Sequence, residues 1–296
     1  MDVLISGATG LIGSALTPEL EARGHKIRRL TRTPRLERDI SWNPEAGVIE
    51  GDISGTEAVV HLAGESIAEG RWTEEKKRRI LESRQKGTRL LAERVAGLSD
   101  PPSVMVSVSA TGYYGNRGNE LLTEESEPGD LFLSKVCREW EAAAEPAREA
   151  GVRVVHPRFG IVLTTEGGAL GTTLPIFKLG GGGKIGSGKQ YWSWVSLDDV
   201  IGAIVHALET DDLSGPVNVV TPGPPTNSEY TRVLGKVLNR PTLFTVPAPA
   251  ARVMLGEIAD ELLLASARVE PVRLQETGYS FHHPELETTL RYLLGR

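Results

Sequence analysis

The N-terminal glycine loop constrains the fold of this chain more than any other feature. An apolar run from Val3 to Ser6 leads directly into glycines at positions 7, 10 and 13, and a helix-like apolar pattern follows. Gly7 permits a tight turn out of a strand, Gly10 lets a pyrophosphate approach the backbone, and Gly13 lets the next helix pack closely on the strand. The pattern predicts a dinucleotide-binding loop, and a βα turn without a ligand is the alternative.

The loop also predicts where phosphate groups would bind. Helix N-termini present free N–H groups to anions, and this helix starts within the loop and ends at Gly24. The expected cofactor contacts here are Gly7, Thr9, Gly10, Leu11, Ile12 and Gly13.

Strand-like runs alternate with helical patterns over the first two thirds of the chain. The runs are Val3 to Ser6, Lys26 to Thr31, Ala58 to Leu62, Val104 to Ser109 and Val152 to Pro157. Such alternation predicts an α/β fold of the Rossmann type, a parallel sheet with helices on both faces. We expect a dinucleotide-binding domain over residues 1–220, with residues 165–195 contributing to the substrate cleft. Residues 221–296 are expected to form a smaller, mostly helical lobe.

Composition restricts the partners. The formal net charge is −6, which argues against nucleic acid or an anionic membrane as the main partner. Cys137 is the single cysteine, as is typical of a protein in a reducing compartment. We see no targeting segment or membrane-length apolar run, so we expect a cytoplasmic protein with a small-molecule substrate. Assembly into a homodimer is left open.

The residues after the second predicted strand indicate which dinucleotide binds. NAD-binding sites place an acidic residue about 20 positions beyond the glycines, whereas this chain has Thr31 and Arg32 there. An arginine suits the 2′-phosphate of NADP, so NADP(H) is favoured over NAD(H). The alternative is a solvated basic strand end, because Arg28, Arg29 and Arg35 cannot all be ligands.

Several motifs together resemble the extended, epimerase-like branch of the short-chain dehydrogenase/reductase superfamily. The loop Gly7 to Gly13 and the run Val59 to Gly64 match that branch. Closer motifs resemble the epimerases of the YfcH type with their C-terminal domain: Gly64-Glu65, Arg71-Trp72, Ser83-Arg84, Tyr113-Tyr114-Gly115, Trp140-Glu141, residues 186–190 and residues 247–293. The resemblance implies NADP contacts at Leu62, Ala63, Arg79 and Arg84, and Gly64 is a candidate contact beside them. Arg84 is equally well explained as a helix-surface cation, and Arg158 is a further candidate contact.

The catalytic pattern of that superfamily is incomplete here. The superfamily uses a tyrosine and a lysine four residues later, which share one helix face. Lys135 is present, but the tyrosine position holds Leu131, and the hydroxyl position four residues before Tyr114 holds Ala110.

We therefore expect the chemistry, if any, to use neighbouring groups. Either Tyr113 or Tyr114 would supply the proton, either Ser109 or Thr111 would orient the substrate, and Lys135 would contact the cofactor. The alternative is that both tyrosines only pack and that Lys135 forms an ordinary surface pair with the glutamate at position 139.

A glycine-rich loop supplies further candidates for a substrate cleft. They follow the run of glycines at 180–183 and comprise Lys184, Lys189, Gln190, Tyr191, Trp192 and Trp194. Asp198 and Asp199 are interpreted as a helix cap. No metal site is expected.

Two functional interpretations follow. The first is an NADP(H)-dependent oxidoreductase or epimerase that acts on a small carbonyl, polyol or sugar-like substrate in a cleft between the Rossmann core and the C-terminal lobe. The second is a catalytically weak NADP-binding regulatory protein, since some relatives of plastid and cyanobacterial type are linked to cell division.

Overall fold

The computed structural model describes residues 1–296. Its contacts divide the chain into two compact units. Unit 1 comprises residues 1–109, 136–157 and 201–217, and unit 2 comprises residues 110–135, 158–200 and 218–296. The boundary near residue 220 expected from the sequence stays a prediction. No helix is both long enough and apolar enough to cross a membrane.

A large, mostly parallel sheet forms the centre of unit 1. Along its main path the strands run β13-β9-β6-β5-β1-β2-β3-β4. Their bounds are β1 Asp2–Ser6, β2 Lys26–Thr31, β3 Asp39–Asn43, β4 Val48–Glu50, β5 Ala58–His61, β6 Val104–Ser107, β9 Arg153–Phe159 and β13 Gly215–Val219. This order, with β1 between β2 and β5, confirms the predicted Rossmann-type fold.

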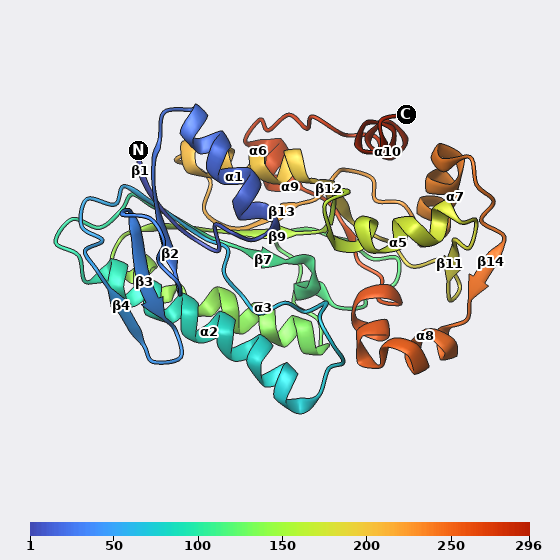
Figure 1. Cartoon of the computed structure of the whole chain (residues 1–296), viewed down its shortest axis with the longest axis horizontal. Coiled ribbons are helices and arrows are strands. Elements are labelled where there is room, and N and C mark those ends of the chain that lie inside the picture. Colours follow the sequence, from blue (N-terminus) through green and yellow to red (C-terminus); the bar gives the residue numbers. More distant parts are fainter. The chain divides into compact units, whose positions relative to one another are not determined.

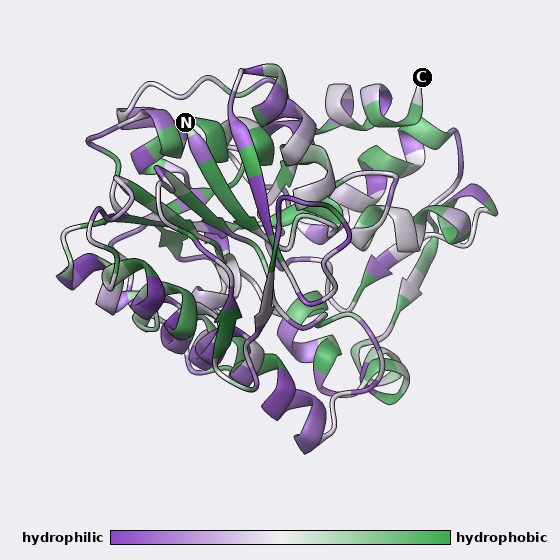
Figure 2. Cartoon of the chain, turned by 60° about the vertical axis from the view of Figure 1, so that its left-hand side comes forward, coloured by the Kyte–Doolittle hydropathy of each residue, from purple (hydrophilic) through white to green (hydrophobic).

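The central strands β1, β5 and β6 are largely apolar and buried. β1 pairs in parallel with β2 and β5, and every residue of β5 is buried. In Figure 2 the strands are mostly green, whereas the helices carry both green and purple residues. Continuous apolar runs of this kind are typical of parallel strands that have helices on both sides.

Helices of unit 1 lie on opposite faces of the sheet, with α1 (Leu11–Ala22) on one side and α2 (Glu74–Ala96) on the other (Figure 1). Leu16 and Leu20 of α1 are completely buried. On the other face, α2 packs with α4 (Glu145–Glu149) and contributes Leu91 and Val95 to the core. Thr73 caps α2 by accepting a hydrogen bond from the backbone N–H of Lys76.

Three further elements contain points where the chain passes from one unit to the other, and one of them, β7, also pairs with β9. They are β7 (Ser109–Ala110), α3 (Phe132–Ala142) and α6 (Leu197–Glu209). The antiparallel β3–β4 pair at the sheet edge was not expected from the sequence.

Unit 2 consists of short elements around its own apolar core. Its strands are β8 Leu121–Leu122, β10 Ile161–Leu163, β11 Gly183–Ile185, β12 Trp194–Ser196, β14 Phe244–Val246 and β15 Arg268–Val269. Its helices are the 3₁₀ helix η1 Thr111–Tyr114, α5 Gly168–Lys178, α7 Asn227–Leu238, α8 Ala248–Leu255, the π-helix η2 Ala259–Leu263, α9 Val272–Glu276 and α10 Leu286–Leu294. The core includes Trp194, Tyr230 and Leu234.

Candidate functional site

The glycine loop has the backbone geometry that its sequence predicts. Gly7 has φ +74°, and a Cβ atom there would lie 2.9 Å from the backbone of both Leu62 and Ala63. A Cβ on Gly13 would overlap the backbone of Gly7 and lie 2.6 Å from the Cα of Ala8. The close approach of these segments therefore requires glycine at both positions.

The N-terminus of α1 is open to an anion. Gly10 is its N-cap and makes no side-chain cap bond, and the first turn carries no acidic residue. The first N–H groups of a helix have no acceptor within the helix, so those of Leu11 and Ile12 are free to bind a phosphate. The arrangement fits the pyrophosphate of a dinucleotide.

Buried polar groups hold the segment after β5 beside the glycine loop. The Ser6 Oγ lies 2.6 Å from the Nδ1 of His61, and it also accepts a hydrogen bond from the backbone N–H of Ala63. His61 is fully buried, and burial lowers its pKa to about 4. The imidazole is therefore neutral at pH 7 and acts as a structural group beneath the predicted contacts Leu62 and Gly64.

Arg84 supports the same segment from α2. Its guanidinium donates hydrogen bonds to the backbone oxygens of Glu65 at 2.9 Å and Ile80 at 3.2 Å, and it lies 4.8 Å from the Trp140 ring centroid. A Cβ on Gly64 would be 3.2 Å from the Arg84 Cζ. Burial lowers the pKa of Arg84. These contacts give Arg84 a positioning role for residues 64 and 65.

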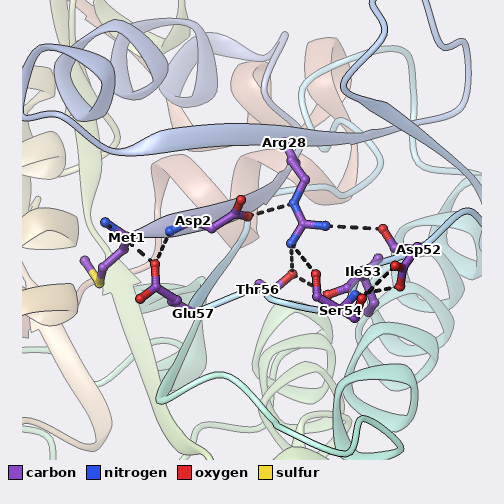
Figure 3. A network of polar contacts seen from close by, with 8 residues as sticks. All are labelled: Met1, Asp2, Arg28, Asp52, Ile53, Ser54, Thr56 and Glu57. Atoms are coloured by element: carbon purple, nitrogen blue, oxygen red, sulfur yellow. Dashed lines mark hydrogen bonds and ion pairs between the residues drawn. The ribbon is translucent and has the colours of Figure 1, made fainter.

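Two of the arginines in and near β2 are committed to structural contacts. The Arg28 Nε donates to Asp2 at 2.7 Å and its Nη2 donates to Thr56 at 2.6 Å, within the network drawn in Figure 3. Arg29 forms two hydrogen bonds with the Asp39 carboxylate and thereby lowers the pKa of that group. Neither guanidinium is therefore available to bind a phosphate. Arg32 and Arg35, which follow β2, are exposed and remain as candidates.

Arg32 and Arg79 are far apart in the sequence, but the charges of both lower the pKa of the Glu65 carboxylate. The pKa of Glu65 is lowered mainly by a hydrogen bond from Lys76, and further by the charges of Lys76, Arg79 and Arg32. The Lys76 Nζ lies 2.7 Å from the Glu65 Oε1, and the Arg79 Nε lies 3.7 Å from it. Thr31, at the end of β2, accepts a hydrogen bond from the backbone N–H of Thr33. This local excess of cations suits a phosphate group.

The two candidate tyrosines lie in different environments. Tyr114 is completely buried, and its hydroxyl donates to the Asn218 Oδ1 at 2.6 Å and accepts from the Arg158 Nη1 at 3.0 Å. Burial raises the pKa of Tyr114 to about 12. Tyr113 is half-buried, and its hydroxyl makes no hydrogen bond. Of the two phenols, that of Tyr113 is free.

Arg158 belongs to the surroundings of these tyrosines. Its guanidinium is almost completely buried, with the Cζ 3.5 Å from the centroid of the Tyr113 ring. It also donates to the Tyr114 hydroxyl. These contacts hold Arg158 inside unit 2, and its proposed contact with the cofactor stays a prediction.

The candidate hydroxyl groups also differ. The Ser109 Oγ is buried and donates to the Glu141 Oε1 at 2.7 Å. The Thr111 hydroxyl makes no hydrogen bond, and Thr111 lines a cavity. Lys135 is exposed on α3, and its backbone N–H donates to the Leu131 oxygen, so the two residues are one helical turn apart.

A cavity of about 90 Å³ lies within unit 2 beside Leu131. Its lining includes Thr111, Leu131, Ile161, Tyr191, Trp192 and Glu261. Tyr191 and Trp192 are two of the residues expected to face a substrate. Trp194 is in the core instead, and the Gln190 Nε2 donates to the backbone oxygens of Ile185 and Leu263.

Sequence reasoning missed Glu261 as a functional candidate. It is 8 % exposed, and its carboxylate accepts backbone hydrogen bonds from Phe132 at 2.9 Å and Leu133 at 3.0 Å. No local motif marks it. Its neighbour Asp260 is also acidic, so nothing in the local sequence distinguishes Glu261.

The chain matches two known protein families. The NAD dependent epimerase/dehydratase family matches residues 3–221, and the domain of unknown function DUF1731 matches residues 246–293. The chain therefore belongs to the NAD dependent epimerase/dehydratase family, which confirms the resemblance found in the sequence.

Similar proteins extend over the whole chain. Epimerase family protein Mb2239 of Mycobacterium bovis is 40% identical, with 99% of this chain and 98% of the relative covered. Epimerase family protein SDR39U1 of Homo sapiens is 36% identical, with 100% of each covered. The crystal structure of human SDR39U1 with NADPH superposes with a TM-score of 0.93 and covers 100% of both chains.

Proposed function

We propose that this protein binds NADP(H) and is an oxidoreductase or epimerase that acts on a small carbonyl, polyol or sugar-like substrate. The observation that carries the proposal is the glycine cradle at Gly7 and Gly13, beside the open N-terminus of α1. A Cβ at either glycine would collide with backbone, so the loop can keep this close approach only with glycine. The residues present fit a dinucleotide pyrophosphate.

The preference for NADP over NAD is supported by charge. Arg32 and Arg79 both act on Glu65, and Arg28 and Arg29 are occupied elsewhere. We assign the 2′-phosphate to Arg32, with Arg79 as a second cation. The human relative crystallised with NADPH, at 36% identity over the whole chain, supports the same assignment.

NADP(H), when bound, supplies a hydride donor or acceptor. For the accompanying proton we propose Tyr113 rather than Tyr114, because the hydroxyl of Tyr113 is free and that of Tyr114 is buried in two hydrogen bonds. Thr111 would orient the substrate oxygen, since it lines the cavity while Ser109 is bound to Glu141. Lys135 would contact the cofactor.

The position of Leu131 favours a second candidate function. Its side chain lines the cavity at the position where the superfamily has its tyrosine, and leucine cannot transfer a proton. A protein that binds NADP(H) without efficient turnover, and acts through partners, would tolerate this residue.

A cytoplasmic location belongs to the same proposal. Its support is the single cysteine, Cys137, which is buried and free. Free thiols of this kind persist in reducing compartments.

A crystal structure with NADP⁺ bound tests the proposal. We expect the pyrophosphate on the N–H groups at the start of α1, the 2′-phosphate at Arg32, and the Tyr113 hydroxyl within proton-transfer reach of a substrate atom beside the nicotinamide C4. If only apolar side chains face C4, the binding function replaces the enzymatic one. A cofactor bound away from the glycine loop would refute both.

A further inference from the structure

Four neighbouring strands of unit 1 change from apolar to polar residues at the same level of the sheet. One row of opposite residues belongs to the core cluster that α2 helps to form, and it comprises Leu4, Val59, Met105 and Val154. Two residues further along the same strands, on the same face of the sheet, lie Ser6, His61, Ser107 and His156. Each residue of this second row, the polar row, is at most 2 % exposed. The sheet therefore carries a buried polar layer directly beside an apolar one.

Helix α2 covers both rows with different residues. Leu91 and Val95 pack in the core cluster with the apolar row. One turn earlier, Gly87 faces the polar row, because a Cβ atom there would lie 3.9 Å from the Cε1 of His61. Thr88 follows Gly87 and is completely buried. The polar row is therefore enclosed between the sheet and α2.

Four buried side-chain atoms in this layer make no hydrogen bond with the protein: His61 Nε2, Thr88 Oγ1, Ser107 Oγ and Trp140 Nε1. Trp140 reaches the layer beside Arg84, which lies one turn before Thr88 on α2 and has its guanidinium 4.8 Å from the Trp140 ring centroid. A buried polar group without a hydrogen bond is costly, so four together would remove a large part of the stability of a domain. These atoms therefore indicate a small ligand that hydrogen-bonds to them.

The space beside His61 is large enough for a small molecule. A Cβ atom on Gly87 would lie 3.5 Å from the Trp42 ring and 3.9 Å from the His61 Cε1, and both are ordinary contact distances. The space can therefore hold a group as large as a methyl, which is about the size of a water molecule. Because Cε1 is bonded to Nε2, a molecule there lies within reach of the nitrogen that makes no hydrogen bond.

The charges of the layer favour water over an anion. Hydroxyl groups both donate and accept hydrogen bonds, and a water molecule can do the same with Thr88 and Ser107. A buried anion would need a cation directed at it. His61 is neutral at pH 7, and the Nη1 of Arg84 donates to two backbone oxygens. Neither group therefore marks an anion site.

We propose that the polar row and α2 enclose a site for ordered internal water, in which a water molecule bridges the imidazole of His61 to the hydroxyls of Thr88 and Ser107. Buried waters in proteins make about three hydrogen bonds, the number that these three side chains offer. The water connects α2 to the ends of β5 and β6, immediately before the predicted coenzyme contacts Leu62 and Ala63. This inference goes beyond the proposed function and does not depend on a bound coenzyme.

A high-resolution crystal structure of the full chain, grown without coenzyme and soaked in sodium bromide, tests the proposal. We expect density for a water molecule within hydrogen-bond distance of the His61 Nε2 and of at least one of the two hydroxyls, with no anomalous signal from bromide. A bromide peak at this position would show an anion site instead and would overturn the proposal. Absence of density there, or direct hydrogen bonds between the side chains, would overturn it as well.

Thr88→Val tests the bridge because it removes the hydroxyl and keeps the shape of the side chain. If water is bound to the hydroxyl, the variant should unfold at a lower urea concentration than the wild type, since the water loses a partner. If the hydroxyl has no partner, its removal should be neutral or stabilising, and that result would contradict the proposal. Thr172→Val, at an exposed position of α5, is the control and should change the urea midpoint little.

A second variant keeps the proposal testable if Thr88→Val does not fold. In Gly87→Ala the added methyl fits without overlap and occupies the space beside His61, so the crystal structure of this variant should lack the water at Nε2. A water that stays in its wild-type position would place the site elsewhere and refute the assignment. Gly97→Ala is the control, because a Cβ there would meet only backbone oxygens of its own helix, and it should keep the water.

Discussion

The glycine loop of unit 1 and the Leu131–Lys135 turn of unit 2 represent two different kinds of site. At the loop, recognition depends on backbone: Gly7 and Gly13 allow close approach, and α1 presents free N–H groups. At the turn, the superfamily's chemistry depends on one phenol, and this chain has leucine there. Because a backbone site does not depend on the distant side chain, cofactor binding can persist where the usual catalytic residue is lost.

The largest expected effect is at the loop. In Gly13→Val the added side chain would overlap the backbone of Gly7 and Ala8, so NADPH binding should weaken at least a hundredfold by calorimetry. Gly97→Ala is the control, because a Cβ there meets its nearest neighbour at an ordinary 3.5 Å. If Gly13→Val binds NADPH with wild-type affinity, cofactor binding does not depend on the close backbone approach at the glycine loop.

Substitution of the two tyrosines tests whether unit 2 has a proton donor in place of the missing phenol at position 131. On any carbonyl compound that supports NADPH oxidation, Tyr113→Phe should lower kcat by about 10²-fold or more, the usual effect of removing a general acid. Tyr114→Phe should retain turnover but lose about 1–3 kcal/mol of stability, since Asn218 and Arg158 lose a buried partner. The reverse pattern would assign the proton to Tyr114.

Stability should depend on pH through His61. Its pKa is about 4 when folded, against about 6.5 unfolded, so below pH 6.5 the unfolded chain binds a proton that the folded chain does not. The free energy of unfolding should therefore fall by about 2 kcal/mol from this group between pH 7.5 and pH 5.

Urea unfolding at the two pH values measures this loss. His61→Asn should remove that part of the pH dependence while lowering stability at neutral pH. Equal pH dependence in the wild type and the variant would show that the imidazole is not held neutral beside Ser6.

The smallest effect is expected at the 2′-phosphate. Arg32→Ala should weaken the binding of NADPH about tenfold and leave the affinity for NADH unchanged, because one charge-assisted contact with the 2′-phosphate is lost. Arg38→Ala removes an exposed arginine of the same loop and should change neither affinity. If Arg32→Ala weakens the binding of both coenzymes equally, Arg32 does not contact the 2′-phosphate.

Much of the sheet could be predicted from the sequence because parallel strands with helices on both faces are continuous apolar runs. β1, β5 and β6 coincide with such runs to within two residues at either end, whereas β2 matches its predicted range although three of its six residues are basic. The β3–β4 pair was missed because it is short and polar, with only Ile40 and Trp42 buried in β3. Alternation over five residues is a weak signal.

The site was predictable only where it is local in sequence. The glycine spacing marks the loop, and the lysine spacing identifies Leu131. The sequence could not predict which of Tyr113 and Tyr114 is buried. Adjacent residues of a 3₁₀ helix point in different directions, and no local pattern indicates which direction faces the core. Glu261 reaches α3 across about 130 positions of sequence, and no periodicity records a contact of that kind.

The account depends first on an intact coenzyme site, and titration of the wild-type chain with NADPH and NADH in a calorimeter tests it most directly. The account predicts saturable binding of one NADPH per chain, at least tenfold tighter than NADH. Absence of saturable binding by either coenzyme would contradict it.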